Sequence, residues 1–202
     1  MPIAVGRGEI VEKTYPLSFE QEYEVVSRAA KVQRGETLLD LGCGTGLYTR
    51  PLAQRARPGL VVGLDLSSAM LRAAAHLARQ QKLSNVIFVH GTALRLPFPS
   101  ARFDVVNCCG ALQLFPNPGR VLREIYRVLK PGGRFTAATA RWNRGPLGRW
   151  TANSIAQMLG IRPFSRNELE ARCHRVGLGE VKFHHASRLW LIMSARKTAE
   201  IS

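Results

Sequence analysis

The sequence has no apolar run long enough to span a membrane, because a spanning helix needs about 20 consecutive apolar residues. Its first residues, MPIAVGRGEIVEK, lack the long apolar core of a signal peptide. Cysteine is also rare: there are four, and none forms a CxxC pair. We therefore expect no metal site and no disulfide framework. Together these absences favour a soluble protein in the reducing cytoplasm.

Acidic residues are scarce as well. The 202 residues include 14 Asp and Glu against 29 Lys and Arg, which gives a formal net charge of +15. Such a charge suits nucleic acid, an anionic membrane surface or acidic substrates. However, the basic residues are scattered, and even the group of Arg141, Arg144 and Arg149 is interrupted by apolar residues. A generally basic, solvated surface and a partner-binding face are therefore both open interpretations.

The most informative stretch is TLLDLGCGTG, residues 37–46. A short apolar run carries one acid, Asp40, and then breaks into glycine at three alternate positions, Gly42, Gly44 and Gly46. An apolar run followed by glycine and a helical pattern indicates a buried parallel strand that turns into a helix. Glycines in such a turn let a ligand approach the backbone closely, and the helix start offers unpaired N–H groups.

Strands and helices alternate along most of the chain. Strands are expected over residues 37–41, 60–64, 86–90, 103–107, 134–140, 181–187 and 189–195. Helices are expected over residues 18–32, 45–56, 67–81, 119–129 and 165–176, with KPGG at 130–133 as a sharp stop. This rhythm predicts an α/β fold with a mostly parallel seven-stranded sheet. The last two strands, joined by almost nothing, are expected to form an antiparallel hairpin at its end.

A glycine turn after a first strand can hold NAD, FAD or S-adenosylmethionine. The dinucleotide pattern GxGxxG fails here, because Leu47 stands at its sixth position. Asp65 ends the second strand, 19 residues past Gly46. A carboxylate at that point can accept hydrogen bonds from both hydroxyls of a ribose, although a turn Asp that caps its own loop is the alternative. Residues 91–93 and 107–110 stand at the ends of the next two strands. They are therefore expected at the same edge of the sheet, where they would complete the candidate ligand site.

At this point the sequence resembles the class I S-adenosylmethionine-dependent methyltransferases. It is most similar in style to the ubiquinone/menaquinone C-methyltransferase-like group of small-molecule enzymes. The matching segments are LDLGCGTG, VVGLDLSSAML, HGTALRLPFPSARFDVV, VLREIYRVLKPGGRF and, in the tail, SRNELEARCHRVGLGEVKF. The resemblance implies a three-layer Rossmann-like sandwich. It also implies an S-adenosylmethionine-dependent methyltransferase that releases S-adenosylhomocysteine.

The resemblance also assigns cofactor contacts, residue by residue. The methionine half would lie among Asp40, Gly42, Cys43, Gly44, Thr45 and Gly46. Asp65 would hold the ribose, Leu66 and Met70 would pack on the adenine, and Thr92 and Ala93 would meet its edge. The sulfonium side would be lined by Cys108, Cys109 and Gly110, and Tyr15 would fold over the cofactor. One departure is Thr92, since the family often has Asp there, which leaves backbone contacts from Ala93 to serve the adenine.

No catalytic base is evident. Methyl transfer from a sulfonium mainly requires positioning and exclusion of water, so a base matters only when the nucleophile must lose a proton. The candidates for a catalytic role are His184, His185 and Gln113. The two histidines are strand neighbours that face opposite sides, and packing or surface roles are favoured for them. Gln113 lies where relatives often carry histidine, and it cannot act as a base.

We interpret residues 1–202 as a single methyltransferase domain, with 1–34 as an N-terminal cap segment and 141–164 as a substrate-cap insertion. Both segments can reach the carboxyl ends of the strands, where ligands of open α/β sheets bind. Trp142, Trp150, Met158 and Phe164 would suit a small, apolar or aromatic acceptor. The alternative is that these residues simply close a small helical cap. C-, O- and N-methylation are all left open.

Two rival functions have distinct sequence signatures. A nucleic-acid methyltransferase is suggested by the charge, but residues 107–110 lack the proline-containing motifs that base N- and C5-methylating enzymes carry. A cofactor-binding protein without turnover is the second rival, because a fold alone does not secure a function. We therefore expect a small-molecule acceptor and disfavour nucleic acid. A peripheral contact with an anionic membrane that carries a lipid quinone is kept as an interpretation, as is either a monomer or a homodimer.

Overall fold

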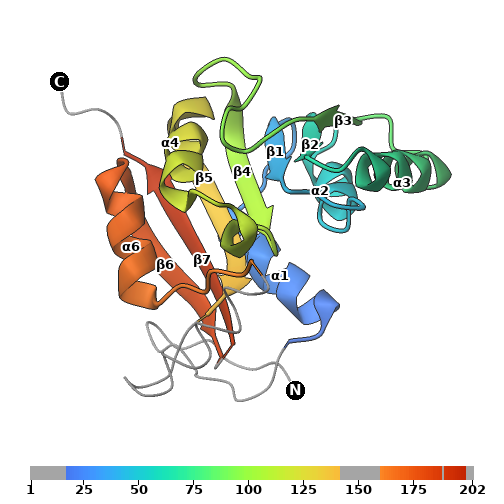
Figure 1. Ribbon diagram of the computed structural model, residues 1–202. Helices are drawn as coiled ribbons and strands as arrows, with labels where there is room; N and C mark the ends of the chain where they lie inside the picture. The colour runs from blue at the N-terminus through green and yellow to red at the C-terminus, as the bar shows by residue number, and fades with distance from the viewer. Residues whose placement is uncertain (1–16, 142–159, 188, 199–202) are drawn as a thin grey trace, which may run out of the picture.

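The computed structural model describes residues 17–141, 160–187 and 189–198 (Figure 1). Its centre is a seven-stranded sheet in the order β3-β2-β1-β4-β5-β7-β6. The strands are β1 (Leu38–Leu41), β2 (Val61–Asp65), β3 (Val86–His90), β4 (Phe103–Cys109), β5 (Leu129–Ala140), β6 (Leu178–Ala186) and β7 (Trp190–Lys197). β7 pairs antiparallel with β5 and β6, whereas the other pairs are parallel. The predicted α/β fold with a terminal antiparallel hairpin is confirmed.

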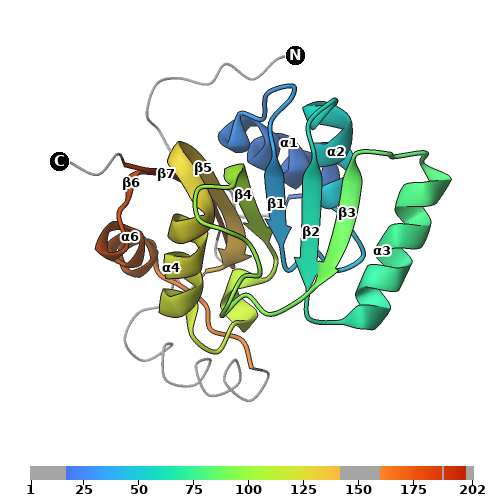
Figure 2. The ribbon, with the colours of Figure 1, turned by 90° about the horizontal axis from the view of Figure 1, so that it is seen from above.

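Helices cover both faces of the sheet and make three layers (Figure 2). They are α1 (Phe19–Ala30), α2 (Thr49–Ala56), α3 (Ser68–Gln80), α4 (Pro118–Val128) and α6 (Arg166–Arg175), with a short 3-10 helix, η1 (Leu112–Leu114). α1 and α2 enclose one apolar cluster with the sheet, while α4 and α6 enclose the other. α3 packs against β2 and β3 at the edge of the sheet. All four residues of β1 are buried, as expected of a central parallel strand.

The two largest differences from the predicted boundaries are at β5 and α2. KPGG at 130–133 is a bulge inside β5, which already pairs with β4 at Leu129 and resumes its register at Arg134. The glycines allow the extra residues to be accommodated without ending the strand. Helix α2 begins at Thr49, and not at Thr45, because the glycine turn extends up to it. The turn is therefore longer than the helical pattern suggested.

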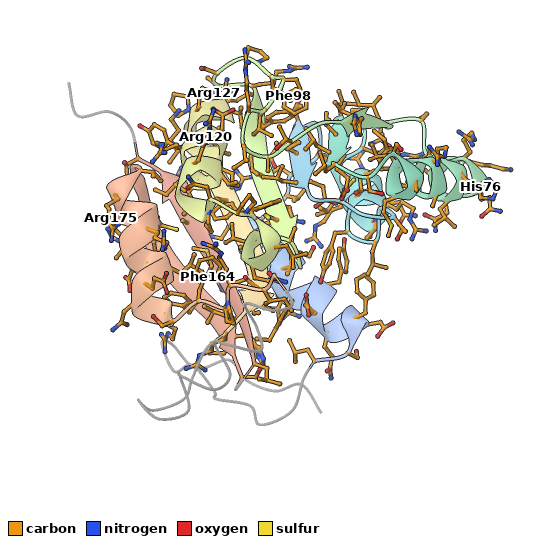
Figure 3. All side chains as sticks on the ribbon, in the orientation of Figure 1. His76, Phe98, Arg120, Arg127, Phe164 and Arg175 are labelled. Atoms are coloured by element: carbon orange, nitrogen blue, oxygen red, sulfur yellow. The ribbon has the colours of Figure 1, made fainter. Side chains whose placement is uncertain are left out.

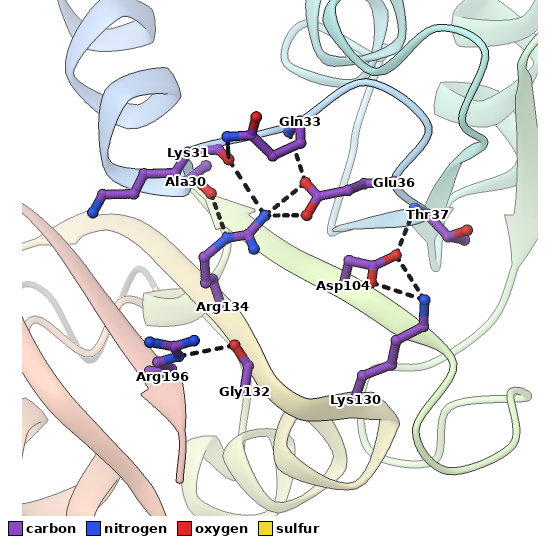
Figure 4. Close-up of polar contacts among 10 residues, drawn as sticks. All are labelled: Ala30, Lys31, Gln33, Glu36, Thr37, Asp104, Lys130, Gly132, Arg134 and Arg196. Carbon is purple, nitrogen blue, oxygen red and sulfur yellow. Dashed lines mark hydrogen bonds and ion pairs between the residues drawn. The ribbon is translucent and has the colours of Figure 1, made fainter. Parts of the chain in front are cut away.

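The amino ends of the strands are joined by a polar clamp (Figure 4). The Arg134 guanidinium binds both carboxylate oxygens of Glu36, at 2.6 and 2.7 Å. Asp104 accepts hydrogen bonds from the Thr37 N–H, at 2.9 Å, and from Lys130 Nζ, at 2.8 Å. These contacts tie β1, β4 and β5 together at the edge opposite the glycine turn. Among the described residues, no helix is both long and apolar enough to cross a bilayer.

Candidate cofactor site

The glycine turn after β1 is fixed by backbone hydrogen bonds to β2. Gly42, Gly44 and Gly46 have φ values of +71°, +53° and +76°, a region that favours glycine. The N–H groups of Gly42 and Cys43 both donate to the carbonyl of Leu64, at 2.8 and 3.0 Å. A Cβ on Gly42 would lie 2.4 Å from the Ala111 Cβ, whereas a Cβ on Gly44 would meet nothing within 4 Å. The turn therefore packs against Ala111 at Gly42, whereas the space beside Gly44 contains no protein atom within reach of a Cβ.

Asp65 joins this turn to the loop after β2. One carboxylate oxygen accepts a hydrogen bond from the Gly44 N–H at 2.8 Å, and the other accepts from the Ser67 N–H at 2.8 Å. The contact with Ser67 is the loop-capping role that we considered as the alternative, so Asp65 does cap its own loop. Each oxygen keeps a further lone pair, because an ionised carboxylate has about four acceptor positions. The carboxylate can therefore hold the turn and still accept from ribose hydroxyls.

Asp40 lies beneath the turn in a buried polar network. Its carboxylate is 2% exposed and accepts hydrogen bonds from the Thr49 hydroxyl, at 2.5 Å, and from the Asn107 amide, at 2.7 Å. Asn107 in turn accepts from the Thr136 hydroxyl and the Cys109 thiol. Burial raises the pKa of Asp40, although the hydrogen bonds from Thr49 and Asn107 oppose the shift. The network fixes the ends of β1 and β4 and the first turn of α2.

Apolar side chains stand exposed just after β2. Leu66, which directly follows Asp65, is 70% exposed, and Met70, in the first turn of α3, is 46% exposed. The ring of His90 lies 2.8 Å from the Leu66 carbonyl, which joins the two strand ends. Thr92 is exposed, and its hydroxyl accepts from the Leu94 N–H at 3.2 Å, while the neighbouring Ala93 is buried. This exposed apolar shelf beside Asp65 has the chemistry that an adenine ring needs.

The end of β4 supplies buried thiols and an open glycine. Cys108 and Cys109 are buried, and burial, with the nearby charge of Asp40, raises the pKa of both thiols. They are neutral at physiological pH, so neither is an activated nucleophile. Gly110 has a φ of +73°, and a Cβ there would meet nothing within 4 Å. The backbone of Gly110 is therefore the accessible part of this strand end.

Of the three catalytic candidates, only Gln113 comes near the glycine turn. Its amide donates to the Gly110 carbonyl and its oxygen accepts from the Thr139 hydroxyl, both at 2.9 Å. His184 and His185 lie on β6, four strand spacings from β1, or about 19 Å. Burial lowers the pKa of His184, with Lys182 contributing, and its ring is 2.7 Å from the Ser194 hydroxyl. His185 is buried.

The structure also places residues at this edge that sequence reasoning missed. The Tyr48 hydroxyl, just past the glycine turn, donates to the Glu22 carboxylate of α1. The rings of Phe19 and Tyr23 lie 5.4 and 6.4 Å from that of Tyr48, as centroid distances. Burial raises the pKa of Glu22, while contacts with Tyr48 and Trp190 oppose the shift. In the sequence, the residues that could have indicated these contacts are Tyr48, two residues past Gly46, and Asn107, a polar residue inside an apolar strand.

Several predicted contacts lie outside the described residues. These are Tyr15, Trp142, Trp150 and Met158. Phe164 is described, and its side chain is 2% exposed within the main core, next to α4 and α6. Its backbone N–H donates to the Ala140 carbonyl at 3.0 Å. The side chain therefore fills the core, and the acceptor-facing position that we expected for it does not follow from this geometry.

A surface groove elsewhere is not part of this edge. It lies between α4 and the loop after β3, near the labelled Phe98, Arg120 and Arg127 in Figure 3. The Arg127 guanidinium donates to the carbonyls of Phe98 and Leu96 at 2.7 and 3.0 Å and pairs with Glu124. These contacts hold the loop on α4, so the groove is explained by packing of the loop.

Comparison with known proteins shows which sequences and folds this chain resembles. Residues 39–137 match a family described as a methyltransferase domain. A demethylmenaquinone methyltransferase of Geobacillus is 40% identical over 112 residues, which are 55% of this chain and 48% of the relative. Among solved structures, an S-adenosylmethionine-dependent methyltransferase from Aquifex aeolicus has a TM-score of 0.71, with 20% identity over 88% of this chain and 90% of that chain. The [4+2]-cyclase SpnF has a TM-score of 0.76, with 22% identity over 89% of this chain and 82% of that chain.

Residues 39–137 therefore resemble a methyltransferase domain, and the described residues share the Rossmann-like fold of solved S-adenosylmethionine-dependent methyltransferases. The chain's sequence relatives are demethylmenaquinone methyltransferases. The chain spans about half the length of the curated relatives it matches.

Proposed function

We propose that the chain binds S-adenosylmethionine at the carboxyl ends of β1 and β2 and transfers its methyl group to a small acceptor. The observation that carries this proposal is the carboxylate of Asp65, which accepts hydrogen bonds from Gly44 and Ser67 and lies between the glycine turn and the apolar shelf of Leu66 and Met70. A ribose needs acceptors and an adenine needs an apolar surface, and this edge provides both.

In this proposal each part of the edge has a separate task. Gly44 and Gly110 let the backbone approach the methionine half, because a Cβ at either position would point into open space. Asp40 and Asp65 give the turn a negative character in a chain of net charge +15, which favours a sulfonium cation. When bound, S-adenosylmethionine supplies an already activated methyl group. The protein then has to orient the acceptor and exclude water.

Calorimetric titration with S-adenosylhomocysteine tests the site. Asp65→Ala should weaken binding by about 30-fold, since a hydrogen bond to a charged group contributes roughly 2 kcal/mol. Asp104→Ala is the matched control. Asp104 also accepts a backbone N–H, from Thr37 at 2.9 Å, but at the opposite edge of the sheet. Equal affinities of the wild type and Asp65→Ala, or no binding by the wild type, would contradict the proposal.

We infer that the acceptor is small and apolar or aromatic, of the quinone type, and that it is methylated on carbon or oxygen. The support is the sequence relatives, whose names specify demethylmenaquinone. The test is incubation with methyl-labelled S-adenosylmethionine and 1,4-dihydroxynaphthalene, which carries the reduced ring of such a quinone. Mass spectrometry then distinguishes C-methyl from O-methyl product. If neither product is labelled, but another metabolite of a cell extract is, the acceptor assignment is wrong and the assignment as a methyltransferase stands.

Two other functions are distinguished by separate measurements. A nucleic-acid methyltransferase is favoured only by the net charge of +15. It predicts labelled RNA or DNA and binding that falls steeply with salt. A binding protein or an enzyme of another reaction is favoured by the [4+2]-cyclase, which shares this fold. It predicts tight cofactor binding with no methyl transfer.

The remaining assignments follow from the same proposal. We interpret residues 1–34 and 141–164 as cap segments of one methyltransferase domain. A cytoplasmic location fits the four cysteines, which are all free thiols. Light scattering in solution would distinguish the monomer from the homodimer.

A further inference from the structure

A carboxylate of α1 lies among aromatic rings at the carboxyl edge of the sheet. Glu22, in the first turn of α1, is half-buried and accepts a hydrogen bond from the Tyr48 hydroxyl. Tyr48 comes two residues after the glycine turn. The rings of Phe19 and Tyr23, also on α1, have centroids 5.4 and 6.4 Å from that of Tyr48. Glu22 therefore joins α1 to the strand end at which the cofactor is proposed to bind.

Two further strands bring side chains to the same carboxylate. Trp190 starts β7 and pairs with the last residue of β5, so it stands at the carboxyl edge. Burial raises the pKa of Glu22, and the side chains of Tyr48 and Trp190 oppose this rise, which places the indole beside the carboxylate. Burial also raises the pKa of the Cys109 thiol, and the charge of Glu22 adds to that rise. Gly110 comes next, where a Cβ would meet nothing within 4 Å. Glu22 therefore lies near the open end of β4.

The polar groups around Glu22 are less suited to take a proton from a ligand. Asp40 is 2% exposed, and both its oxygens already accept side-chain hydrogen bonds. Burial raises the pKa of Tyr48 and of Cys109, so both keep their protons at neutral pH. An ionised carboxylate has about four acceptor positions, and Tyr48 occupies one of those of Glu22. Glu22 therefore has acceptor positions left for a ligand.

Cations of the neighbouring elements lie away from this carboxylate. α1 packs on β5, β6 and β7. The charged and titratable side chains that reach it from these strands and from α2 do so at its last two turns: Arg55 at Ser27, Arg134 at Ala30, and His184, beside Lys182, at Lys31. At the first turn, Glu22 faces the neutral Tyr48 and Cys109. Its protonation therefore responds to burial and to the hydrogen-bond donors beside it.

We propose that Glu22 accepts the hydroxyl proton of the methyl acceptor, and that this acceptor is a hydroxylated aromatic ring. The ring would pack on Phe19, which is 36% exposed, and on the half-buried Tyr23 and Trp190, because aromatic side chains offer flat apolar faces. The inference rests on the proposed function and names the proton-accepting group within it. A carboxylate kept among aromatic rings lowers stability, which is typical of groups retained for function.

The proton transfer balances for either methylated atom. The O–H bond of the acceptor breaks, its proton moves to a carboxylate oxygen of Glu22, and the electron pair stays on the acceptor's oxygen. That pair makes the oxygen, or a ring carbon conjugated with it, electron-rich enough to take the methyl group that the cofactor supplies. After C-methylation the ring carbon loses its hydrogen as a proton, and Glu22 returns its own proton to the oxygen. After O-methylation Glu22 gives its proton to water, so one proton is released per methyl group in both cases.

Initial rates with methyl-labelled S-adenosylmethionine and 1,4-dihydroxynaphthalene, measured without oxygen from pH 5 to 9, test this role. The wild-type kcat/KM should fall as pH falls from 7 to 5, because protonated Glu22 cannot accept a proton. Glu22→Gln should lower kcat about 100-fold at pH 7 and should lack this fall. Its rate should approach that of the wild type near pH 9, because a phenolic hydroxyl of pKa about 10 begins to ionise without a base.

Three further variants separate a proton acceptor from a structural residue. Glu22→Asp should lose less activity than Glu22→Gln and keep the fall at acid pH. Tyr48→Phe removes a donor to the ionised carboxylate, so the fall should begin at higher pH. Glu24→Gln is the matched control on the same helix. Glu24 is exposed and pairs with Arg28 at 2.7 Å, so the variant should keep the wild-type rate and pH profile.

Acceptor binding gives a measurement that needs no turnover. In the presence of S-adenosylhomocysteine, the wild type should bind 1,4-dihydroxynaphthalene about ten-fold more tightly than 1,4-naphthoquinone, which has the same rings and no O–H group. In Glu22→Gln this preference should fall to about two-fold, because a neutral amide oxygen is the weaker acceptor. If the wild type does not turn over this acceptor, the preference decides whether Glu22 accepts from its hydroxyl.

The outcomes for the cofactor and for Glu22 are distinct. A wild type that does not bind S-adenosylhomocysteine contradicts the proposed function. Equal pH profiles of wild type and Glu22→Gln, or an equal preference for the diol, overturn the role of Glu22 alone, as does a wild type that does not bind the diol. A loss of about ten-fold or more in S-adenosylhomocysteine affinity in Glu22→Gln also overturns it, because Glu22 would then hold the cofactor. Thermal unfolding of each variant shows that the fold is kept.

Discussion

The amide of Asn107 donates a hydrogen bond of 2.7 Å to the carboxylate of Asp40, and both side chains are buried. This contact joins β4 to β1. The glycine turn follows β1, and Gly110 follows β4. Thr49 donates to the other carboxylate oxygen from the start of α2. One carboxylate therefore sets the spacing of three elements around the candidate cofactor site.

Replacing Asn107 by Leu should destabilise the protein by about 2–3 kcal/mol, because a buried carboxylate loses one of its two side-chain donors. Urea unfolding followed by circular dichroism measures the change. The control is Asn167→Ala on α6, an exposed position that should stay within about 0.5 kcal/mol of the wild type. Similar losses of unfolding free energy in the two variants would show that the Asn107–Asp40 hydrogen bond contributes no more to stability than an exposed side chain does.

The first two glycines of the turn should respond differently to alanine. Gly42→Ala places a Cβ 2.4 Å from that of Ala111, so the turn must shift and the free energy of unfolding should fall by about 2–4 kcal/mol. Gly44→Ala meets no protein atom within 4 Å and should cost only about 1 kcal/mol of backbone strain. Its methyl group would instead occupy the proposed ligand space. It should therefore reduce affinity for S-adenosylhomocysteine about ten-fold or more.

Gly35→Ala is the control for backbone strain alone. Its φ is +86°, a Cβ there meets nothing within 4 Å, and it lies at the start of β1, away from the turn. It should lose stability as Gly44→Ala does, yet bind the cofactor like the wild type. If Gly44→Ala keeps its affinity, the open side of the turn does not face the ligand.

Residue patterns were enough to predict the sheet and the turn, because both depend on local sequence. Apolar runs that end in glycine or Asp mark the parallel strands, and the closely spaced last two runs marked the hairpin. The boundary at KPGG was missed for a physical reason. Glycine and proline usually end a strand, yet pairing of Leu129 with Phe103 across the sheet continues β5 through them. That pairing is a tertiary contact, which periodicity does not contain.

The polar partners within the site could not be predicted for a similar reason. Asp40 was chosen by its place before the glycines, but its donors come from Thr49 and from Asn107, which is 67 residues away. Glu22 reaches Tyr48 from a helix that precedes the turn by a whole strand. An isolated polar residue in an apolar strand indicates a buried partner without naming it. Only the three-dimensional arrangement pairs these side chains.

Glu22→Gln should alter how stability depends on pH. Burial raises the pKa of Glu22 above its unfolded value. As pH rises past the unfolded value of about 4.3, the unfolded chain loses this proton first, so the contribution of Glu22 to stability falls until the folded pKa is passed. Glutamine does not titrate and can still accept from Tyr48. The variant should therefore gain stability relative to the wild type as pH rises from 4.5 to 7.

Urea unfolding of both proteins at several pH values measures that difference. Tyr48→Phe is the companion variant. It removes the hydrogen bond that favours the ionised Glu22, so its own stability should fall more steeply with pH than that of the wild type. A constant difference between wild type and Glu22→Gln from pH 4.5 to 7 would show that Glu22 titrates alike in the folded and unfolded chain.

The four thiols should react slowly with a disulfide reagent in the folded protein. All are buried, and burial raises the pKa of each, that of Cys173 to about 12. At pH 8 a thiol of pKa 12 is ionised to about one part in ten thousand, whereas a free cysteine is ionised to about a quarter. Absorbance of the released thiolate should therefore rise at least about 100-fold more slowly than for glutathione. In guanidinium chloride all four thiols should react.

This measurement also separates the proposed function from the nucleic-acid alternative. Enzymes that methylate the C5 position of cytosine need a nucleophilic cysteine, and Cys108 and Cys109 are the two at the end of β4. Fast labelling of either in the folded protein, located by peptide mass, would support that alternative. Slow labelling of both, with cofactor affinity intact, leaves direct transfer of the methyl group to a small acceptor as the chemistry that these strand ends support.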